Sequence, residues 1–324
     1  MKQMKQAVKI LMITLVAVGV LSLQPALAKK AYPKKPIKLI VCYSPGGDAD
    51  LTARVWADFA EKELGQPVVV VNKTGGGGVA GTTFAAHARP DGYTLFLAQA
   101  GATLIAPQTA QTTYDVDSFE YISRIMIGNC GVIAHKDAPW NTLADFVKDA
   151  KAKPNTLLYA SPGAATWLTL AVQHWEMIAD VDLKHVEHQG SAPAVTSLLG
   201  KHTNISFVFP QNYIPQVKSG NIKLLALGSP SDKFPGVPSF AQLGYSGEYI
   251  GWGGIAAPKG TPKEVIDKIA ATTKVLVKNP QFIKALENIH ATPSYIGPEE
   301  WTDAVNQQYK DLAVVIDNLG IRAK

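Results

Sequence analysis

The chain has 324 residues, with 31 Lys and Arg against 26 Asp and Glu, and a formal net charge of +5. Three of the lysines lie in the first nine residues, so the rest of the chain is nearly balanced, with 28 basic and 26 acidic residues. This balance, and the lack of a basic run interleaved with aromatic residues, argue against a nucleic-acid-binding protein. A hydrophobic content of 47% is ordinary for a globular chain, and the length indicates two domains or one large one.

The first 28 residues have the order of a secretory signal peptide. A basic start is followed by an apolar run over residues 10–23, and Ala26-Leu27-Ala28 places small residues where a signal peptidase cleaves. The apolar run is short for a membrane span, and an uncleaved anchor is the alternative. We expect cleavage after Ala28 and a soluble mature chain of 296 residues in the periplasm.

Short apolar runs alternate with helical stripes over the first hundred residues. Strands are expected at 36–44, 67–72 and 94–100, with helices at 48–65 and from residue 79 to Pro90. This alternation predicts a parallel sheet covered by helices.

The pattern changes at about 119–134, a long extended segment that leads into a second α/β unit. A helix is expected at 142–154, with Thr142 as its N-cap. Strands at 156–161, 183–188 and 204–209 then alternate with helices from about Thr166 and Ala192.

The remaining segments are expected to return to the first unit. Residues 222–229 and 248–258 are interpreted as extended connections, and Thr261-Pro262-Lys263-Glu264 as the N-cap and first turn of a helix. A stripe of apolar residues predicts a last helix: Trp301, Val305, Leu312, Ile316 and Leu319. We therefore assign residues 29–130 and 228–324 to domain 1 and 131–227 to domain 2, with a ligand cleft between two α/β lobes.

The two cysteines, Cys42 and Cys130, are far apart in the sequence. An oxidising compartment would allow a disulfide between them. A chain of this length can bury a sufficient core without one, so we favour two buried thiols.

A glycine-rich loop follows the second expected strand. Gly76, Gly78 and Gly81 fit G-x-G-x-x-G, but the next strand ends in Gln99-Ala100-Gly101 and supplies no acid for a ribose. Residues 44–47 form a similar loop one βα unit earlier. Because both loops precede helices, together they could bind one small anion, most simply a carboxylate. The alternative is two tight turns that need glycine only for its backbone freedom.

Eight motifs, in order, carry a resemblance to a known family: PGGDADLTAR, NKTGGGGVAG, ARPDGYTLF, TYDVDSFEYIS, HQGSAPAVTSLLG, VKSGNIKLLAL, VPSFAQLGY and GWGGIAAPKGTP. Together they resemble the periplasmic solute-binding proteins of tripartite tricarboxylate transporters, the Bug family. The resemblance implies a two-lobed periplasmic-binding-protein fold, type II-like, that closes on its ligand like a Venus flytrap. It implies no enzymatic activity, no cofactor and no metal.

Carried over motif by motif, the resemblance also implies the ligand-binding residues. In the first domain these are Ser44, Pro45, Gly46, Gly47, Asp50, Gly76, Gly77 and Gly78. In the second they are Ser161, Ala165, Thr166, Gln189, Gly190, Ser191, Ala192 and Val208. Asp50 has an alternative role, in which it caps its helix and binds Arg54.

Departures from the family pattern concern the ligand. Val208 stands where an aspartate can face an ammonium group, and Asn204 replaces another acid. A buried ammonium without an ionic partner is costly, so these residues favour a di- or tricarboxylate or an aromatic acid without an amino group. The implied partners are this carboxylate and the large and small membrane subunits of a transporter, with the receptor itself a monomer.

Other functions have weaker support. His185 and His188 are too few for a zinc site, and no nucleophile elbow is present. Trp252 could form a wall of the cleft or pack at its hinge. An exported hydrolase or isomerase acting on a small acid, and a periplasmic sensor for a signalling kinase, are the alternatives to a transport receptor.

Overall fold

The structure is a computed structural model that describes residues 32–246 and 249–323. The expected signal peptide and its cleavage site lie outside the described residues. Residues from Lys35 onward form one compact unit, which contains every element named below. Within the described ranges, no helix combines the length and the apolar character needed to cross a bilayer.

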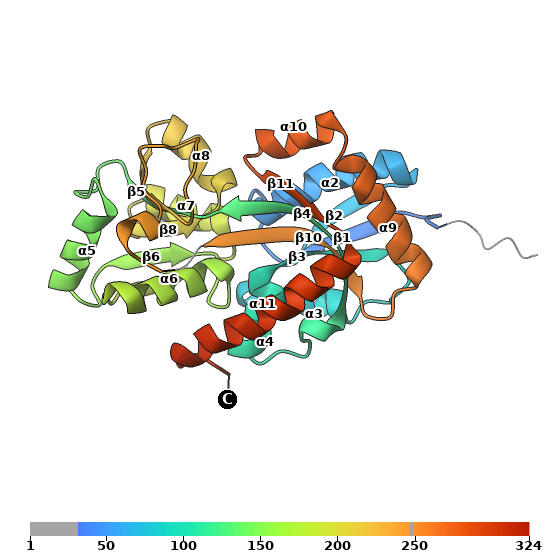
Figure 1. The fold of residues 1–324 in the computed structure, drawn as a ribbon, viewed down its shortest axis with the longest axis horizontal. Helices are drawn as coiled ribbons and strands as arrows, with labels where there is room; N and C mark the ends of the chain where they lie inside the picture. The colour runs from blue at the N-terminus through green and yellow to red at the C-terminus, as the bar shows by residue number, and fades with distance from the viewer. Residues whose placement is uncertain (1–31, 247–248, 324) are drawn as a thin grey trace, which may run out of the picture. The chain divides into compact units, whose positions relative to one another are not determined.

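The first lobe is built on a mixed six-stranded sheet in the order β11-β4-β10-β3-β1-β2 (Figure 1). Its strands are β1 (Ile37–Val41), β2 (Val68–Asn72), β3 (Thr94–Gln99), β4 (Phe119–Asn129), β10 (Ile250–Pro258) and β11 (Thr292–Ile296). The apolar runs of β1, β2 and β3 pair in parallel, as the β-turn-α order predicts. β10 is antiparallel to both β3 and β4, and thereby inserts a late segment into the middle of the sheet.

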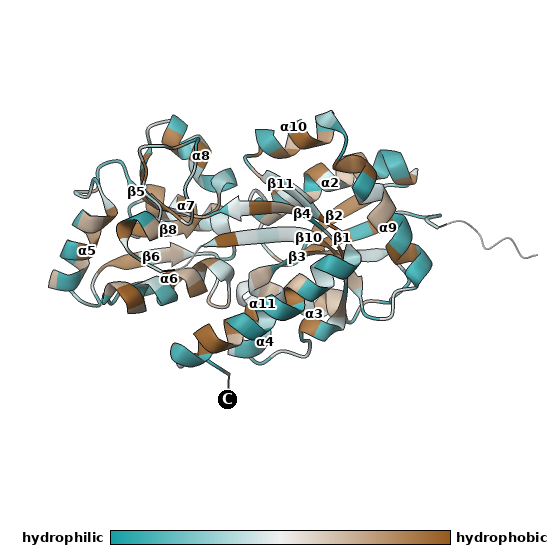
Figure 2. Cartoon of the chain, viewed as in Figure 1, coloured by the Kyte–Doolittle hydropathy of each residue, from teal (hydrophilic) through white to brown (hydrophobic). Residues whose placement is uncertain are grey.

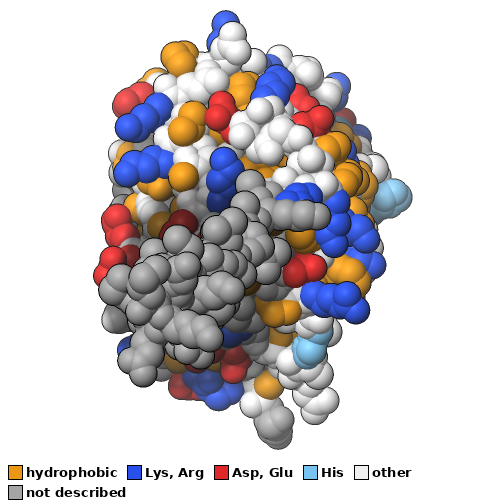
Figure 3. Space-filling model, turned by 90° about the vertical axis from the view of Figure 1, so that its right-hand side faces the viewer, with side chains coloured by type: hydrophobic (Ala, Val, Ile, Leu, Met, Phe, Trp, Pro, Cys, Tyr) orange, Lys and Arg blue, Asp and Glu red, His pale blue; other side chains and the backbone are white. Residues whose placement is uncertain are grey.

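Helices cover this sheet (Figure 1). They are α2 (Asp48–Leu64), α3 (Val79–Ala86), α4 (Ala106–Thr109), α9 (Lys263–Leu276), α10 (Pro280–Asn288) and α11 (Pro298–Asn318). The longer ones, α2, α9, α10 and α11, are amphipathic with polar residues on their outer faces (Figure 2). Helix α2 is followed by Gly65, whose left-handed backbone forms its C-cap. On the face seen in Figure 3, Lys and Arg side chains are interspersed with Asp and Glu, in keeping with the balanced charge.

The second lobe has a five-stranded sheet in the order β7-β6-β8-β5-β9. Its strands are β5 (Gly131–His135), β6 (Leu158–Ser161), β7 (Lys184–Glu187), β8 (Ile205–Val208) and β9 (Ile222–Leu227). Its helices are α5 (Leu143–Ala152), α6 (Trp167–Ala179), α7 (Ser191–Leu199) and α8 (Pro210–Lys218). Buried aromatic residues around Trp175, including Phe146 and Phe207, form its core. The predicted arrangement of two α/β lobes is confirmed.

Two extended crossings join the lobes. In the first crossing, β4 runs almost without a break into β5. In the second, the chain returns to the first lobe through Tyr249 and β10. The crossings are hydrogen-bonded to each other, since the Cys130 amide donates to the Tyr249 carbonyl at 3.2 Å. Phe240 and Tyr249 pack in the core of the second lobe. The predicted domain boundaries stay a prediction. Because of this packing, we propose that the chain leaves domain 2 near Tyr249 rather than at residue 228.

Several local predictions can be compared with the structure. Thr142 caps α5 as expected, in a reciprocal capping box with Asp145. Cys42 and Cys130 are both buried and unpaired, which confirms the thiol prediction, and burial raises the pKa of each to about 12.

Two expectations are wrong in detail. Residues 222–227 form the edge strand β9 instead of a connection, because they pair with β5. Helix α9 begins at Lys263 with Pro262 as its N-cap. The Thr261 hydroxyl, expected to cap this helix, donates instead to the Pro258 carbonyl at 2.7 Å.

The burial of Glu176 on α6 makes the stability of the second lobe depend on pH, and this dependence can be measured. Glu176 is half-buried, and its Oε1 accepts a hydrogen bond from the Leu183 amide at 2.8 Å. Burial, aided by Asp182, raises the pKa of Glu176 to about 7. The stability that this acid contributes is therefore complete below pH 4.5, its ordinary pKa, and is lost as the pH rises through about 7.

We predict that Glu176→Gln, which keeps the acceptor but not the charge, melts at the same temperature as wild type at pH 5. At pH 8 it should melt about 2–4 °C higher, for a difference near 1 kcal/mol. Thermal unfolding followed by circular dichroism at both pH values measures this. A loss of stability in the variant that is equal at both pH values would contradict the assignment.

Candidate functional site

A narrow cavity lies between the lobes at the carboxyl ends of their strands, where α/β sheets bind ligands. The first lobe lines it with Tyr43, Asp48, Gln99, Ala100, Gly101, Gly251 and Trp252. The second lobe contributes Pro162, Thr166, Trp167, Leu168, Ser191 and Phe209. The cavity volume of about 30 Å³ holds about two water molecules.

The cavity is small because the lobes touch on either side of it. The Ser44 amide donates to the Gln189 carbonyl at 3.1 Å, and the Ser191 hydroxyl donates to Asp48 Oδ1 at 2.8 Å. Backbones meet where glycines remove the side chain: a Cβ on Gly163 would lie 2.5 Å from Gly77 Cα. A Cβ on Gly101 would likewise lie 2.7 Å from the Trp167 amide nitrogen. The lobes are therefore in direct contact in this structure.

Three helices from the two lobes begin at this cavity. Asp48 is the first residue of α2, Trp167 and Leu168 open α6, and Ser191 opens α7. Each helix N-terminus carries about half a positive charge and amide groups without intrahelical partners. Their convergence makes the cavity favourable for an anion.

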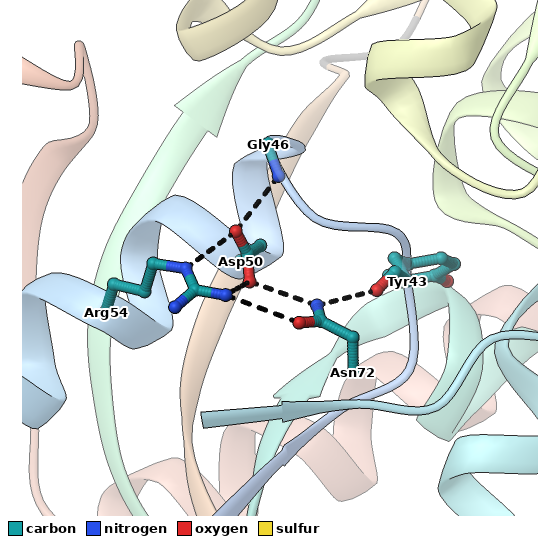
Figure 4. Close-up of polar contacts among 5 residues, drawn as sticks. All are labelled: Tyr43, Gly46, Asp50, Arg54 and Asn72. Carbon is teal, nitrogen blue, oxygen red and sulfur yellow. Dashed lines mark hydrogen bonds and ion pairs between the residues drawn. The ribbon is translucent and has the colours of Figure 1, made fainter. Parts of the chain in front are cut away.

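Asp50 anchors the first glycine loop (Figure 4). Its Oδ2 accepts from the Gly46 amide and from Arg54 Nε, both at 2.9 Å, while Oδ1 accepts from Arg54 and Asn72. Asn72 also donates to the Tyr43 carbonyl at 3.0 Å, which ties β2 to the start of the loop. Burial alone would raise the pKa of Asp50, but the Arg54, Gly46 and Asn72 donors outweigh it and hold the pKa below its usual value. These contacts favour the structural role for Asp50.

Most of the other loop residues predicted from the sequence lie at the contact between lobes, whereas Gly78 lies against Cys42 and Tyr43 of its own lobe. Ser44 to Gly47 meet the segment from Gln189 to Ala192, and Gly77 meets Gly163 to Ala165. The Ser44 hydroxyl is buried without a hydrogen-bond partner among the described residues. Of the predicted set, Thr166 and Ser191 line the cavity itself. Thr166 also caps α6 by accepting from the Thr169 amide at 3.2 Å.

Other predicted residues lie further from the cavity. The Ser161 hydroxyl is within hydrogen-bonding distance of Thr169 Oγ1 and of His185 Nε2, both at 2.6 Å. Gly76 and Ala165 line a separate surface cavity. Whether any of these residues contacts the ligand stays a prediction.

Val208 requires a correction. Its side chain is fully buried in the core of the second lobe against Ile133, Val195 and Leu198, and it does not line the cavity. The next residue, Phe209, does. Asn204 is also structural, because its Oδ1 accepts from the Leu158 amide at 2.7 Å. The sequence argument against an amino group in the ligand therefore loses its basis.

Sequence reasoning missed most of the cavity lining. Asp48 and Gln99 were not identified, although Gln99 Nε2 donates to Asp48 Oδ2 at 2.8 Å. An acid in the first turn of a helix is common, so its position alone did not single out Asp48. Trp252 lines the cavity, which is one of the two roles considered for it, and its Nε1 donates to Gln308 on α11 at 2.7 Å. Within 32–246 and 249–323, no three His, Cys, Asp or Glu side chains are placed to hold a metal ion.

Comparison with known families agrees with this geometry. Residues 52–321 match the model of the tripartite tricarboxylate transporter family receptor. The chain belongs to this family. BugT of Bordetella pertussis is 29% identical over 300 residues, which cover 90% of this chain and 92% of BugT. The resemblance to the Bug family is thus confirmed, and the family is one of solute-binding receptors.

Solved structures extend the comparison to three dimensions. The periplasmic binding protein BugD superimposes with a TM-score of 0.86 at 30% identity, covering 90% of this chain and all of BugD. MatC from Rhodopseudomonas palustris, solved with bound malate, gives a TM-score of 0.82 over 88% of this chain and all of MatC. At 23% identity, MatC shows the shared fold alone.

We predict that Gly101→Ala prevents the lobes from meeting without unfolding either one. The backbone of Gly101 does not need a positive φ, but an added Cβ would press against Thr166 and Trp167 of the other lobe. Ligand affinity, measured by calorimetry with a ligand found in the screen below, should fall at least about tenfold, for a steric cost above 1.4 kcal/mol.

Gly236→Ala is the matched control, because a Cβ there meets no atom within 4 Å and its φ is not positive. This variant should bind as wild type does. Unchanged affinity in Gly101→Ala would show that ligand binding does not require the lobe contact seen here.

Proposed function

We propose that this protein is a periplasmic receptor that captures a small carboxylate between its lobes and delivers it to the membrane subunits of a tripartite tricarboxylate transporter. The observation that carries the proposal is the convergence of three helix N-termini, from both lobes, on one cavity. Family membership supports the delivery step, and the order of the first 28 residues supports the periplasmic location.

Binding and closure are coupled in this arrangement. The ligand carboxylate would accept hydrogen bonds from first-turn amides of α6 and α7, since the hydroxyls of Thr166 and Ser191 already donate to the Gly163 carbonyl and to Asp48. Such charge-assisted bonds are roughly twice as strong as neutral ones. Because the donors come from the second lobe and the cavity floor from the first, the ligand stabilises the closed form. We further propose that Ser44, whose hydroxyl has no hydrogen-bond partner among the described residues, and the amides of Gly76 and Gly77 add donors from the first lobe.

This function requires binding and release without covalent chemistry. Because Val208 lies in the core, the sequence no longer excludes an amino group, and the candidate ligands are di- and tricarboxylates, aromatic acids and amino acids. The aromatic residues of the cavity suit the apolar part of such acids; they are Tyr43, Trp167, Phe209 and Trp252.

The proposal predicts that small carboxylates, and not their amides, stabilise the mature chain. A thermal-shift screen should include mono-, di- and tricarboxylates, aromatic acids and amino acids, each beside its primary amide. A ligand at one hundred times its dissociation constant adds about 2.7 kcal/mol to the free energy of unfolding. The acid should raise the melting temperature by several degrees and the amide should leave it unchanged. A screen in which no acid stabilises the protein, or in which amides do so equally, would refute the proposal.

A further inference from the structure

Asp48 differs from the other acids of the first lobe in its place and its partners. Its side chain lines the cavity, and the residue is only 7% exposed. Both carboxylate oxygens accept bonds from neutral groups, Gln99 Nε2 on Oδ2 and the Ser191 hydroxyl on Oδ1, each at 2.8 Å. One donor comes from each lobe, so the carboxylate is held at the point where the lobes meet.

No basic side chain of the described chain forms an ion pair with Asp48. Arg54, one helical turn and a half further along α2, is bound by Asp50. The other described residues that line the cavity have uncharged side chains. A buried carboxylate without a cation is costly, and burial raises the pKa of Asp48 despite its two hydrogen bonds. A ligand that carries a positive charge would remove this cost.

The rest of the lining suits such a ligand. Tyr43, Trp167, Phe209 and Trp252 surround the same cavity with aromatic rings. Aromatic rings attract ammonium groups, including methylated ones, through the negative potential of their faces. A ligand with carboxylates alone would instead bring like charge to Asp48. The indole nitrogen of Trp167, buried without a partner among the described residues, remains as a donor for the ligand carboxylate.

We propose that Asp48 is a subsite for a cationic group, so that the preferred ligand is a zwitterion with an ammonium, primary or methylated, close to its carboxylate. This inference rests on the proposed function, since the helix N-termini still bind the carboxylate. Val208 had favoured a carboxylate without an amino group. The inference reverses that ligand class, because an acid that can face an ammonium, Asp48, lies on α2 instead of β8.

The test compares ligands that differ only in the charge of one group. For primary amines, alanine is paired with isobutyrate, aspartate with methylsuccinate, and phenylalanine with 2-benzylpropanoate. For a quaternary amine, glycine betaine is paired with 3,3-dimethylbutanoate. Each pair is titrated by calorimetry at neutral pH into wild type, Asp48→Asn and Asp58→Asn. Asp58 lies exposed on the same helix and serves as the control.

In at least one pair, wild type should bind the zwitterion at least about tenfold more tightly than the isosteric acid, as expected for a charged hydrogen bond. Asp48→Asn should remove this preference and Asp58→Asn should retain it. The pair that shows the preference distinguishes a primary from a methylated ammonium.

If wild type binds the plain acids as tightly as the zwitterions or more so, the subsite is refuted while the proposed function stands. If it binds members of neither series, and the wider carboxylate screen is also negative, both are refuted. The wild-type comparison decides the question even if Asp48→Asn does not fold.

Discussion

Backbone contact between the lobes is the constraint on which the site depends. Gly77 meets Gly163, Gly101 meets the first turn of α6, and Gly190 meets Ser44. A side chain at any of these points would hold the lobes apart. Because glycine lets the backbones approach, the N-termini of α2, α6 and α7 reach a single cavity, and their partial charges act on the same ligand group.

Two acids two residues apart on α2 show how the surroundings assign different roles to the same side chain. Asp50 faces Arg54, Asn72 and the Gly46 amide, and its pKa is lowered, so it stays ionised and holds the glycine loop in shape. Asp48 faces the cavity, accepts hydrogen bonds from the neutral donors Gln99 and Ser191, and its pKa is raised by burial. The negative charge of Asp50 is paired within the protein, whereas in our proposal the charge of Asp48 is paired by a ligand.

The sequence predicted those features that depend on local pattern. The parallel strands β1 to β3, the long crossing through residue 130 and the Thr142 cap follow from periodicity and capping chemistry. Features set by three-dimensional pairing were not predictable in this way. Whether 222–227 is an edge strand depends on its pairing with β5, which local sequence does not encode.

The site was harder to predict for the same reason. The error at Val208 is a shift of one residue: side chains alternate along a strand, so Val208 enters the core and Phe209 faces the cavity. Asp48 could be recognised only when Gln99 and Ser191, from distant parts of the chain, were placed beside it.

The most direct test of this account is a crystal structure of the protein with a ligand identified by the stability screen. The account predicts closed lobes, with the ligand carboxylate within hydrogen-bonding distance of first-turn amides of both α6 and α7. A ligand bound outside the cavity, or one whose carboxylate contacts the N-terminus of neither α6 nor α7, would contradict the claim that the helix N-termini at this cavity form the anion site.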